Sequence, residues 1–272
     1  MLDNLKGVCS NCLVFFTDLD GTLLDHQTYS FDPASEALDM LRKRNIPLVL
    51  ASSKTAAEIF PLRRAMGFQH CPAIVENGAG ILSANDPCTG SDASYRALLE
   101  RFSNLPVEIQ EKFTGFSRLG LDDVIKLTGL AEDQAILAKQ RQFSEPGLWS
   151  GGEDELPVFF ELLKEHGMAA QRGGRFLTLS FGGNKVDQMQ KISQEYSRDG
   201  RSCFCVALGD APNDVKMIEA ADVGVIIPNS SHSGIDRLKS ELDGKTVRAP
   251  YPGPRGWNAT VLDLLAMVHQ GG

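Results

Sequence analysis

VFFTDLDGT occupies residues 14–22, an apolar run that ends in Asp18 and Asp20 and is followed by Gly-Thr. A continuous apolar run is typical of a strand buried on both faces of a parallel sheet, and ligands bind beyond the carboxyl ends of such strands. Side chains two positions apart on a strand point to the same face. We therefore expect Asp18 and Asp20 at one exposed sheet edge, where a cation would offset their mutual repulsion.

Three further segments extend this pattern. Residues 206–214 read VALGDAPND, a second apolar run that ends in acids, and residues 47–54 read PLVLASSK and end in small polar residues. Residues 182–185 read GGNK and place a lysine at the start of a predicted helix. A single Asp-Gly is common in turns and would not by itself indicate a site. The ordered set of segments is far more specific than any member.

Strands and helices alternate around these segments. Asp32 and Pro33 suit an N-cap and a first helical position, and Ala37, Leu38 and Leu41 form an apolar face on the helix that follows. Such alternation is typical of an α/β fold with a parallel, Rossmann-like sheet. The expected elements are strands at 46–51, 72–75, 203–208 and 223–227, and helices at 55–66, after Lys185, and at 214–220.

A long insertion separates Ser52 from Lys185. Residues 83–94 are rich in Asn, Asp, Pro, Gly and Ser and are typical of a linker. We predict a discontinuous catalytic core of residues 1–85 and 183–272, with an inserted α+β cap domain at 86–182. The expected cap elements are helices near 95–103, 107–113, 121–127, 132–140 and 155–166, and strands near 169 and at 176–181.

Composition narrows the class of protein. The chain has 272 residues and a net charge of -8, which argues against a nucleic-acid partner. It has no apolar run of about 18 residues that would span a membrane, and no secretory leader pattern, so we expect a cytoplasmic protein. Six scattered cysteines favour free thiols. For the C-x-x-C at Cys9 and Cys12, which has no second pair, an incidental pair is favoured over a zinc or redox role.

In their order the motifs resemble those of the haloacid dehalogenase superfamily of phosphotransferases, in its large-cap (type IIB) subgroup. The resemblance implies that Asp18 is a nucleophile, that Asp20 is a general acid and base, and that the Ser52 hydroxyl and Lys185 bind phosphate. It also implies Mg²⁺, with ligands at Asp18, Asp20 through its carbonyl, Asp210, and Asn213 or Asp214. Mg²⁺ prefers such oxygen ligands. Capping of the next helix is the alternative for Asp214.

A narrower resemblance lies in and beyond the cap. VENGA at 75–79, RQFSEP at 141–146, GPRGWN at 253–258 and parts of residues 115–130 are similar to mannosyl-3-phosphoglycerate phosphatases. This implies Mg²⁺-dependent hydrolysis of that ester to mannosylglycerate and phosphate, through an aspartyl-phosphate. Arginine suits a carboxylate contact. Candidate substrate-binding residues are Ser53, Lys54, Glu76, Asn77, Arg141 and Arg175, with a solvated surface role as the alternative for the cations and a turn-shaping role for Glu76 and Asn77.

Other functions stay open on the sequence alone. The substrate could be glucosyl-3-phosphoglycerate or another sugar phosphate. The glucosyl and mannosyl esters differ in stereochemistry at one sugar carbon, and these motifs do not distinguish the two. A phosphomutase would share the aspartyl-phosphate but pass the phosphoryl group to a second hydroxyl. A non-catalytic sugar-phosphate sensor is less favoured, because a binding protein would not need an acid at Asp20. The expected partner is a small phosphorylated sugar-glycerate, with no nucleic acid and no membrane.

Overall fold

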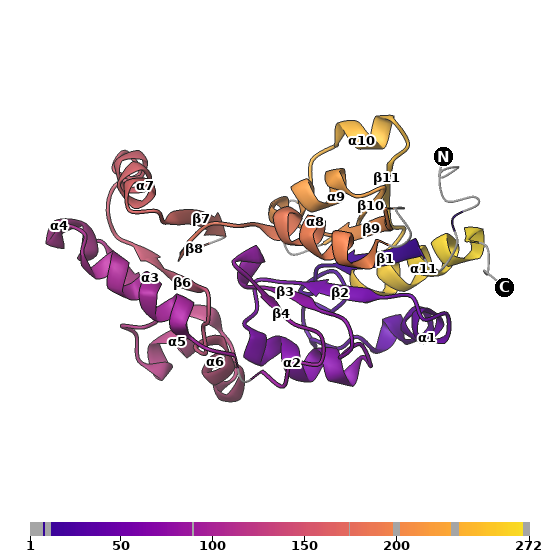
Figure 1. Cartoon of the computed structure of the whole chain (residues 1–272), viewed down its shortest axis with the longest axis horizontal. Helices are drawn as coiled ribbons and strands as arrows, with labels where there is room; N and C mark the ends of the chain where they lie inside the picture. Colours follow the sequence, from indigo (N-terminus) through magenta and orange to yellow (C-terminus); the bar gives the residue numbers. More distant parts are fainter. Residues whose placement is uncertain are drawn as a thin grey trace.

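The computed structural model describes residues 8, 12–88, 90–173, 175–197, 202–229 and 234–268, which form two lobes (Figure 1). Cys9 lies outside the described residues, so the C-x-x-C pair is not placed. Within the described part of the chain, the cysteines are free thiols, as the sequence predicts. No helix in this part combines the length and the apolar character needed to cross a membrane.

The larger lobe is built on a seven-stranded sheet with the order β11-β10-β9-β1-β2-β3-β4. All paired neighbours are parallel except β3 and β4, which form an antiparallel hairpin at the sheet edge. This confirms the predicted parallel α/β core. The strands are β1 (Leu13–Thr17), β2 (Leu48–Ala51), β3 (Ala73–Val75), β4 (Gly80–Leu82), β9 (Phe204–Gly209), β10 (Val223–Ile226) and β11 (Thr246–Arg248).

Helices cover both faces of this sheet (Figure 1). Alternate residues of β1 point to opposite faces, so Phe15 packs in a cluster with Trp257 while Phe16 packs in another with Met189. The first cluster is closed by α1 (Ser35–Lys43), α2 (Ala56–Ala65) and α11 (Gly253–Met267). The second is closed by α8 (Lys185–Tyr196) and α9 (Val215–Ala220). A short helix, α10 (Lys239–Leu242), precedes β11.

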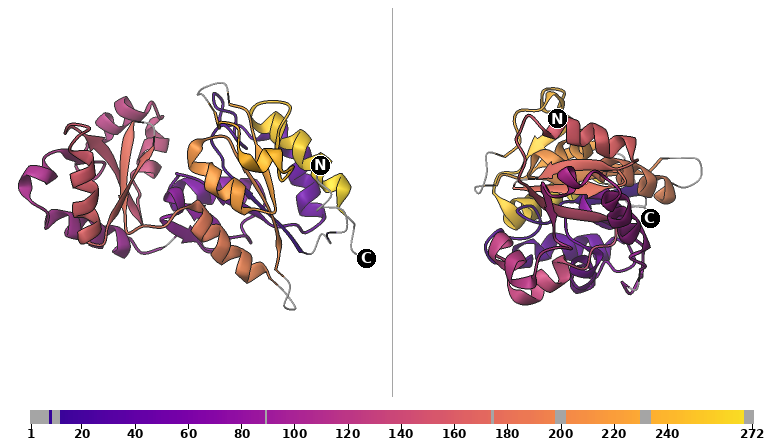
Figure 2. Two further views of the ribbon diagram at one scale, coloured as in Figure 1. Left: turned by 90° about the horizontal axis from the view of Figure 1, so that it is seen from above. Right: turned by 90° about the vertical axis from the view of Figure 1, so that its left-hand side faces the viewer.

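The smaller lobe has a separate antiparallel sheet with the order β5-β6-β8-β7 (Figure 2). Leu177 and Leu179 of β8 pack against α3 and α7 in a separate hydrophobic core. Phe176 and Thr178, which alternate with them along the strand, point to the opposite face and line the pocket. The strands are β5 (Phe113–Gly115), β6 (Ser144–Trp149), β7 (Ala169–Gly173) and β8 (Phe176–Ser180), and the helices are α3 (Ala93–Ser103), α4 (Val107–Gln110), α5 (Leu121–Thr128), α6 (Glu132–Ala138) and α7 (Leu156–Glu165).

Every strand of the smaller sheet comes from the predicted insertion, and every strand of the larger sheet comes from outside it. The cap boundaries at residues 86 and 182 stay predictions. Two local expectations are wrong. Residues 107–113 are not one helix, because α4 ends at Gln110 and Phe113 begins β5. Asp32 does not cap α1 with its side chain, because a 3-10 turn at Asp32–Ala34 precedes that helix.

The C-terminal segment closes the core beside β1. Trp257 is fully buried, and its indole N–H donates to the Thr17 hydroxyl at 3.0 Å. The Ala37 N–H donates to Asn258 Oδ1 at 2.9 Å, which ties α11 to α1. Gly256 allows close contact, since a Cβ there would lie 1.7 Å from the Tyr251 carbonyl oxygen. The GPRGWN motif therefore packs through Trp257 against the strand that precedes Asp18.

Candidate active site

The acidic residues lie together at the carboxyl end of β1, in the middle of the larger sheet. β1 lies between β2 and β9, so the ends of these three parallel strands are neighbours. Asp18 and Asp20 follow β1, Ser52 follows β2, and Asp210 follows β9. Such a point of divergence is where open α/β sheets bind ligands. The sheet topology thus gathers residues that are nearly two hundred positions apart in the sequence.

Asp18, Asp210 and Asp214 form a buried carboxylate cluster. Each offers an oxygen within 4.8 Å of the others. Burial raises the pKa of Asp18 and the nearby carboxylates of Asp214 and Asp210 raise it further, against the opposing effect of Lys185. A divalent cation would relieve this repulsion, and three carboxylate oxygens suit a hard cation such as Mg²⁺. The donor set therefore fits a divalent metal site.

Neighbouring donors hold these carboxylates in place. The Thr22 hydroxyl donates to Asp210 Oδ1 at 2.8 Å, and the Asn229 amide donates to Asp210 Oδ2 at 2.6 Å. The backbone N–H groups of Asp210 and Ala211 donate to Asp214 Oδ2 at 3.2 and 3.1 Å. Asp214 precedes α9 but makes no side-chain cap bond to that helix. Its side chain instead reaches back to the acidic loop.

Lys185 is the cation of the cluster. Asn184 caps α8 by accepting the Asp187 N–H, which sets Lys185 as the first helical residue. Its Nζ donates to Asp18 Oδ1 at 2.6 Å and to Asp214 Oδ1 at 2.7 Å. Burial opposes the charged form, but the two carboxylates outweigh it and raise the pKa of Lys185. The lysine therefore stays protonated beside Asp18.

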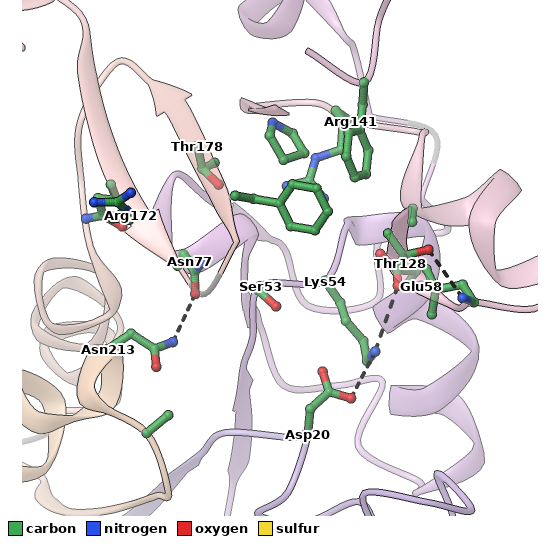
Figure 3. A pocket seen from close by; sticks show the side chains of 18 of the residues that line it. Asp20, Ser53, Lys54, Glu58, Asn77, Thr128, Arg141, Arg172, Thr178 and Asn213 are labelled. Atoms are coloured by element: carbon green, nitrogen blue, oxygen red, sulfur yellow. Dashed lines mark hydrogen bonds and ion pairs between the residues drawn. The ribbon is translucent and has the colours of Figure 1, made fainter. Parts of the chain in front are cut away.

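Asp20 lies apart from that cluster and lines the neighbouring pocket (Figure 3). Lys54 Nζ lies 3.0 Å from Asp20 Oδ1 and 3.9 Å from Glu58 Oε1. Burial lowers the pKa of Lys54, but Asp20 and Glu58 outweigh that effect and raise it. Ser52 is fully buried, and its hydroxyl oxygen accepts the Lys54 N–H at 3.2 Å, whereas Ser53 lines the pocket.

The pocket has a volume of about 700 Å³ and lies between the two lobes. Its core side includes Asp20, Ser53 and Lys54, and Figure 3 shows Arg141 on the side opposite Asp20. A cavity of this size can hold a small organic ligand. The further lining residues include Tyr29, Glu58, Asn77, Ala211 and Asn213 from the core and Phe116, Thr128, Pro146, Gln171, Arg172, Phe176 and Thr178 from the smaller lobe.

The predicted substrate-binding residues divide into two groups. Ser53, Lys54, Asn77 and Arg141 line the pocket. Asn213, a predicted metal ligand, also lines it, and its amide donates to Asn77 Oδ1 at 3.3 Å. The other group, Glu76 and Arg175, is not in the described lining.

Glu76 and Arg175 have other contacts. The Glu76 carboxylate is buried and accepts hydrogen bonds from residues 142–144. Arg175 is exposed and donates to the Leu127 carbonyl at 2.5 Å. Arg172 and Tyr29 also line the pocket, and neither is among the residues predicted from the sequence. No local sequence signal marks Arg172, which lies opposite Leu177 in the β7–β8 register and forms an ion pair with Glu153.

The sequence of this chain matches a family of hydrolases and a curated phosphatase. The model of a family described as haloacid dehalogenase-like hydrolase matches residues 15–119 and 163–243. A curated protein of Persephonella marina, named glucosyl-3-phosphoglycerate/mannosyl-3-phosphoglycerate phosphatase, is 32% identical over 275 residues. The match covers 95% of this chain and 99% of that protein.

Solved structures share the fold at lower identity. A phosphatase of the haloalkanoate superfamily from Bacteroides thetaiotaomicron has a TM-score of 0.61 at 17% identity, covering 93% of this chain and 94% of that one. The sucrose-phosphatase of Synechocystis sp. PCC6803 has a TM-score of 0.57 at 16% identity, covering 93% and 97%. These likenesses support the two-lobed architecture.

Proposed function

The chain belongs to the haloacid dehalogenase-like hydrolases as a phosphatase, and from this premise we propose that it hydrolyses mannosyl-3-phosphoglycerate with Mg²⁺. The observation that carries the chemistry is the buried cluster of Asp18, Asp210, Asp214 and Lys185 beside Asp20 and the pocket. The named activity of the Persephonella relative supports the substrate class. The glucosyl ester is the alternative substrate, since that relative is named for both.

In the first step, an Asp18 oxygen attacks phosphorus and the bond from phosphorus to the glycerate oxygen breaks. Carboxylates act as nucleophiles in this way when they form aspartyl-phosphates. Asp20 gives its proton to the departing oxygen. Lys185 offsets the negative charge shared by the phosphate and Asp18, while Ser52 donates its hydroxyl to the phosphate. Mg²⁺ bound by Asp18, Asp210 and Asp214 would supply further neutralisation of the phosphate oxygens.

In the second step, water attacks the phosphorus of the aspartyl-phosphate. Asp20, now ionised, removes a proton from this water, and the bond between phosphorus and the Asp18 oxygen breaks. Inorganic phosphate leaves and Asp18 is restored. The same carboxyl group thus acts as acid and then as base, so it ends the cycle protonated as it began.

The pocket would hold the part of the substrate that does not react. Arg141 is suited to the glycerate carboxylate, because its planar guanidinium can form paired hydrogen bonds with a carboxylate. Ser53, Lys54, Asn77 and Asn213 offer hydrogen-bonding groups to the sugar and the phosphate. Residues from both lobes line this space, so a bound substrate would be enclosed between them and separated from bulk water.

Phosphate release tests the proposal. We expect Mg²⁺-dependent release from mannosyl-3-phosphoglycerate with a higher kcat/KM than from simple sugar phosphates, and no release in EDTA. The glucosyl ester is measured in parallel. Equal or better hydrolysis of simple esters would contradict the substrate assignment while leaving the aspartate mechanism. Absence of release from every ester would favour a sensor, and transfer to an added sugar acceptor would favour a phosphomutase.

A further inference from the structure

Glu76 is a carboxylate of the core that is enclosed by the smaller lobe. It follows β3, and its side chain is fully buried. Its Oε1 accepts the Gln142 N–H at 2.9 Å. Its Oε2 accepts the N–H groups of Phe143 and Ser144 at 3.2 and 2.7 Å, and the Ser144 hydroxyl at 2.7 Å. Four donors from the segment 142–144 thus converge on one side chain of the other lobe.

Close packing accompanies these hydrogen bonds. The ring of Phe143 packs against the core cluster, and it occupies space beside Gly80 where a Cβ would lie 2.3 Å from a ring carbon. The Thr55 hydroxyl donates to the Leu137 carbonyl at 3.0 Å. Residues 137–144 therefore form a contact between the lobes that is separate from the two chain crossings near residues 83–92 and 181–184. This contact joins the lobes on one side of the pocket, which Ala138 and Arg141 line.

Arg141 is fixed by the same contact. Its Nε lies 3.4 Å from Glu76 Oε2, and its Nη2 donates to the Ser144 hydroxyl oxygen at 3.0 Å. The residue is 9% exposed, and it lines the pocket. A guanidinium has five N–H donors, so these contacts leave others for a ligand. Glu76 offsets the cost of burying the cation, and it orients the plane of the guanidinium.

We propose that Glu76 is a positioning residue that holds Arg141 at a set distance from Asp18, so that the enzyme selects phosphate esters that carry a second anionic group. This inference rests on the proposed function for the identity of that group, a carboxylate. It differs from direct substrate binding by Glu76, whose oxygens are already engaged by four donors. It also differs from a purely structural contact, which would affect every substrate alike.

The test compares Glu76→Gln with the wild type on two esters, mannosyl-3-phosphoglycerate and p-nitrophenyl phosphate, which lacks the second anionic group. We expect the loss of kcat/KM to be at least about 10-fold larger for the glycerate ester than for p-nitrophenyl phosphate, mainly through a higher KM. A 10-fold difference corresponds to about 1.4 kcal/mol. Ser144→Ala should lower the ratio of kcat/KM for the glycerate ester to that for p-nitrophenyl phosphate in the same direction but by a smaller factor. Gln142→Ala is the matched control, because its side chain contacts the Gly90 carbonyl rather than Glu76, and it should leave the ratio unchanged.

A double-mutant cycle with Arg141→Met adds a second criterion. The quantity compared is the ratio of kcat/KM for mannosyl-3-phosphoglycerate to that for p-nitrophenyl phosphate. If Glu76 acts through Arg141, the double variant Glu76→Gln with Arg141→Met should have the same ratio as Arg141→Met alone. Equal losses on both esters, or additive losses in the cycle, would overturn the inference. If Glu76→Gln does not fold, Ser144→Ala and Arg141→Met replace it. Both should lower kcat/KM more for the glycerate ester than for p-nitrophenyl phosphate, and equal losses on the two esters would overturn the inference.

The wild type separates this inference from the proposed function. Preference for a different ester with a second anionic group, such as 3-phosphoglycerate, would contradict the proposed substrate and leave the Glu76 prediction to be judged on that ester. A wild type that hydrolyses no such ester better than p-nitrophenyl phosphate would overturn the inference about Glu76 itself.

Discussion

At the scale of single residues, Lys185 explains how three carboxylates coexist in a buried site. It pairs with Asp18 and Asp214 at 2.6 and 2.7 Å, while Asp210 is held by Thr22 and by the Asn229 amide. Removing one partner of a buried charge pair leaves the other charge uncompensated, which is costly. The cluster is therefore an arrangement in which each acid depends on its neighbours for both geometry and charge.

Asp20→Asn should lower turnover of an alkyl phosphate about 10²- to 10⁴-fold, because the substituted amide cannot give or take the proton. With p-nitrophenyl phosphate, whose leaving group needs no proton, we expect one rapid equivalent of p-nitrophenol and then slow turnover. Rapid-mixing kinetics measure this burst. Wild-type turnover of the alkyl ester would show that the proton comes from another group.

Thr22→Val should weaken Mg²⁺ binding about 10- to 100-fold, as is typical when a residue that orients a metal ligand is lost. The valine keeps the size of the side chain and removes the hydroxyl that donates to Asp210 Oδ1. Activity as a function of Mg²⁺ concentration measures the change. Thr22→Ser, which keeps the hydroxyl, is the control and should stay near the wild type; an equal loss in both variants would contradict the role of the hydrogen bond.

At the scale of elements, the start of α8 depends on a turn in another part of the core. Gly78 has φ of +91°, and a Cβ there would lie 2.1 Å from the Asn184 carbonyl carbon and 2.4 Å from the Lys185 nitrogen. The turn after β3 and the first residues of α8 are thus in direct backbone contact. This contact helps to determine where Lys185 points.

Gly78→Ala should both destabilise the core and reduce kcat, because the new methyl group displaces the N-terminus of α8 from Asp18. Gly253→Ala is the matched control: its φ is also positive, at +57°, but no atom lies within 4 Å of the new Cβ. It should cost only the conformational strain, about 1–2 kcal/mol, and leave kcat unchanged. Urea denaturation and steady-state kinetics measure both effects. Equal behaviour of the two variants would contradict the backbone contact.

At the scale of the whole molecule, the active site is a source of instability when no metal is bound. Burial and the neighbouring acids raise the pKa of Asp18. The folded protein therefore retains this proton to higher pH than the unfolded chain does, so ionisation of Asp18 lowers the free energy of unfolding as pH rises above 3.8, its ordinary pKa. The Asp18 carboxylate that the proposed reaction requires thus lowers the stability of the metal-free protein.

Asp18→Asn should raise the melting temperature in EDTA at neutral pH, because it replaces the repelled carboxylate by a neutral group of similar shape while Lys185 keeps the Asp214 carboxylate as its partner. The difference from the wild type should shrink as pH falls toward 3.8. Mg²⁺ should stabilise the wild type, by about 2.7 kcal/mol at a hundred times its Kd, and should stabilise the variant less. Thermal denaturation over a pH series measures this, and an advantage that grows toward acid pH would contradict it.

Much of the core could be predicted from local sequence. The apolar runs that end in Asp18, Ser52 and Asp210 correspond to β1, β2 and β9, because a short apolar run must be buried on both faces to form a central strand. The buried face of α1, with Ala37, Leu38 and Leu41, was predicted from helical spacing and is confirmed. In the smaller sheet, β7 and β8 correspond to predicted strands. β5 and β6 were not predicted, because β5 has only three residues and β6 contains Pro146 and Gly147.

By itself, the sequence determined the parallel core and the residues at its strand ends, since the burial preference of each run is a property of adjacent residues. Only the tertiary structure decided which side chains share an environment. It gave Lys185 two carboxylate partners, brought Arg172 to the pocket and enclosed Glu76 under residues 142–144. The physical reason is that hydrogen-bond partners and charge neighbours are set by segments that lie far apart in the chain, and no local pattern specifies their pairing.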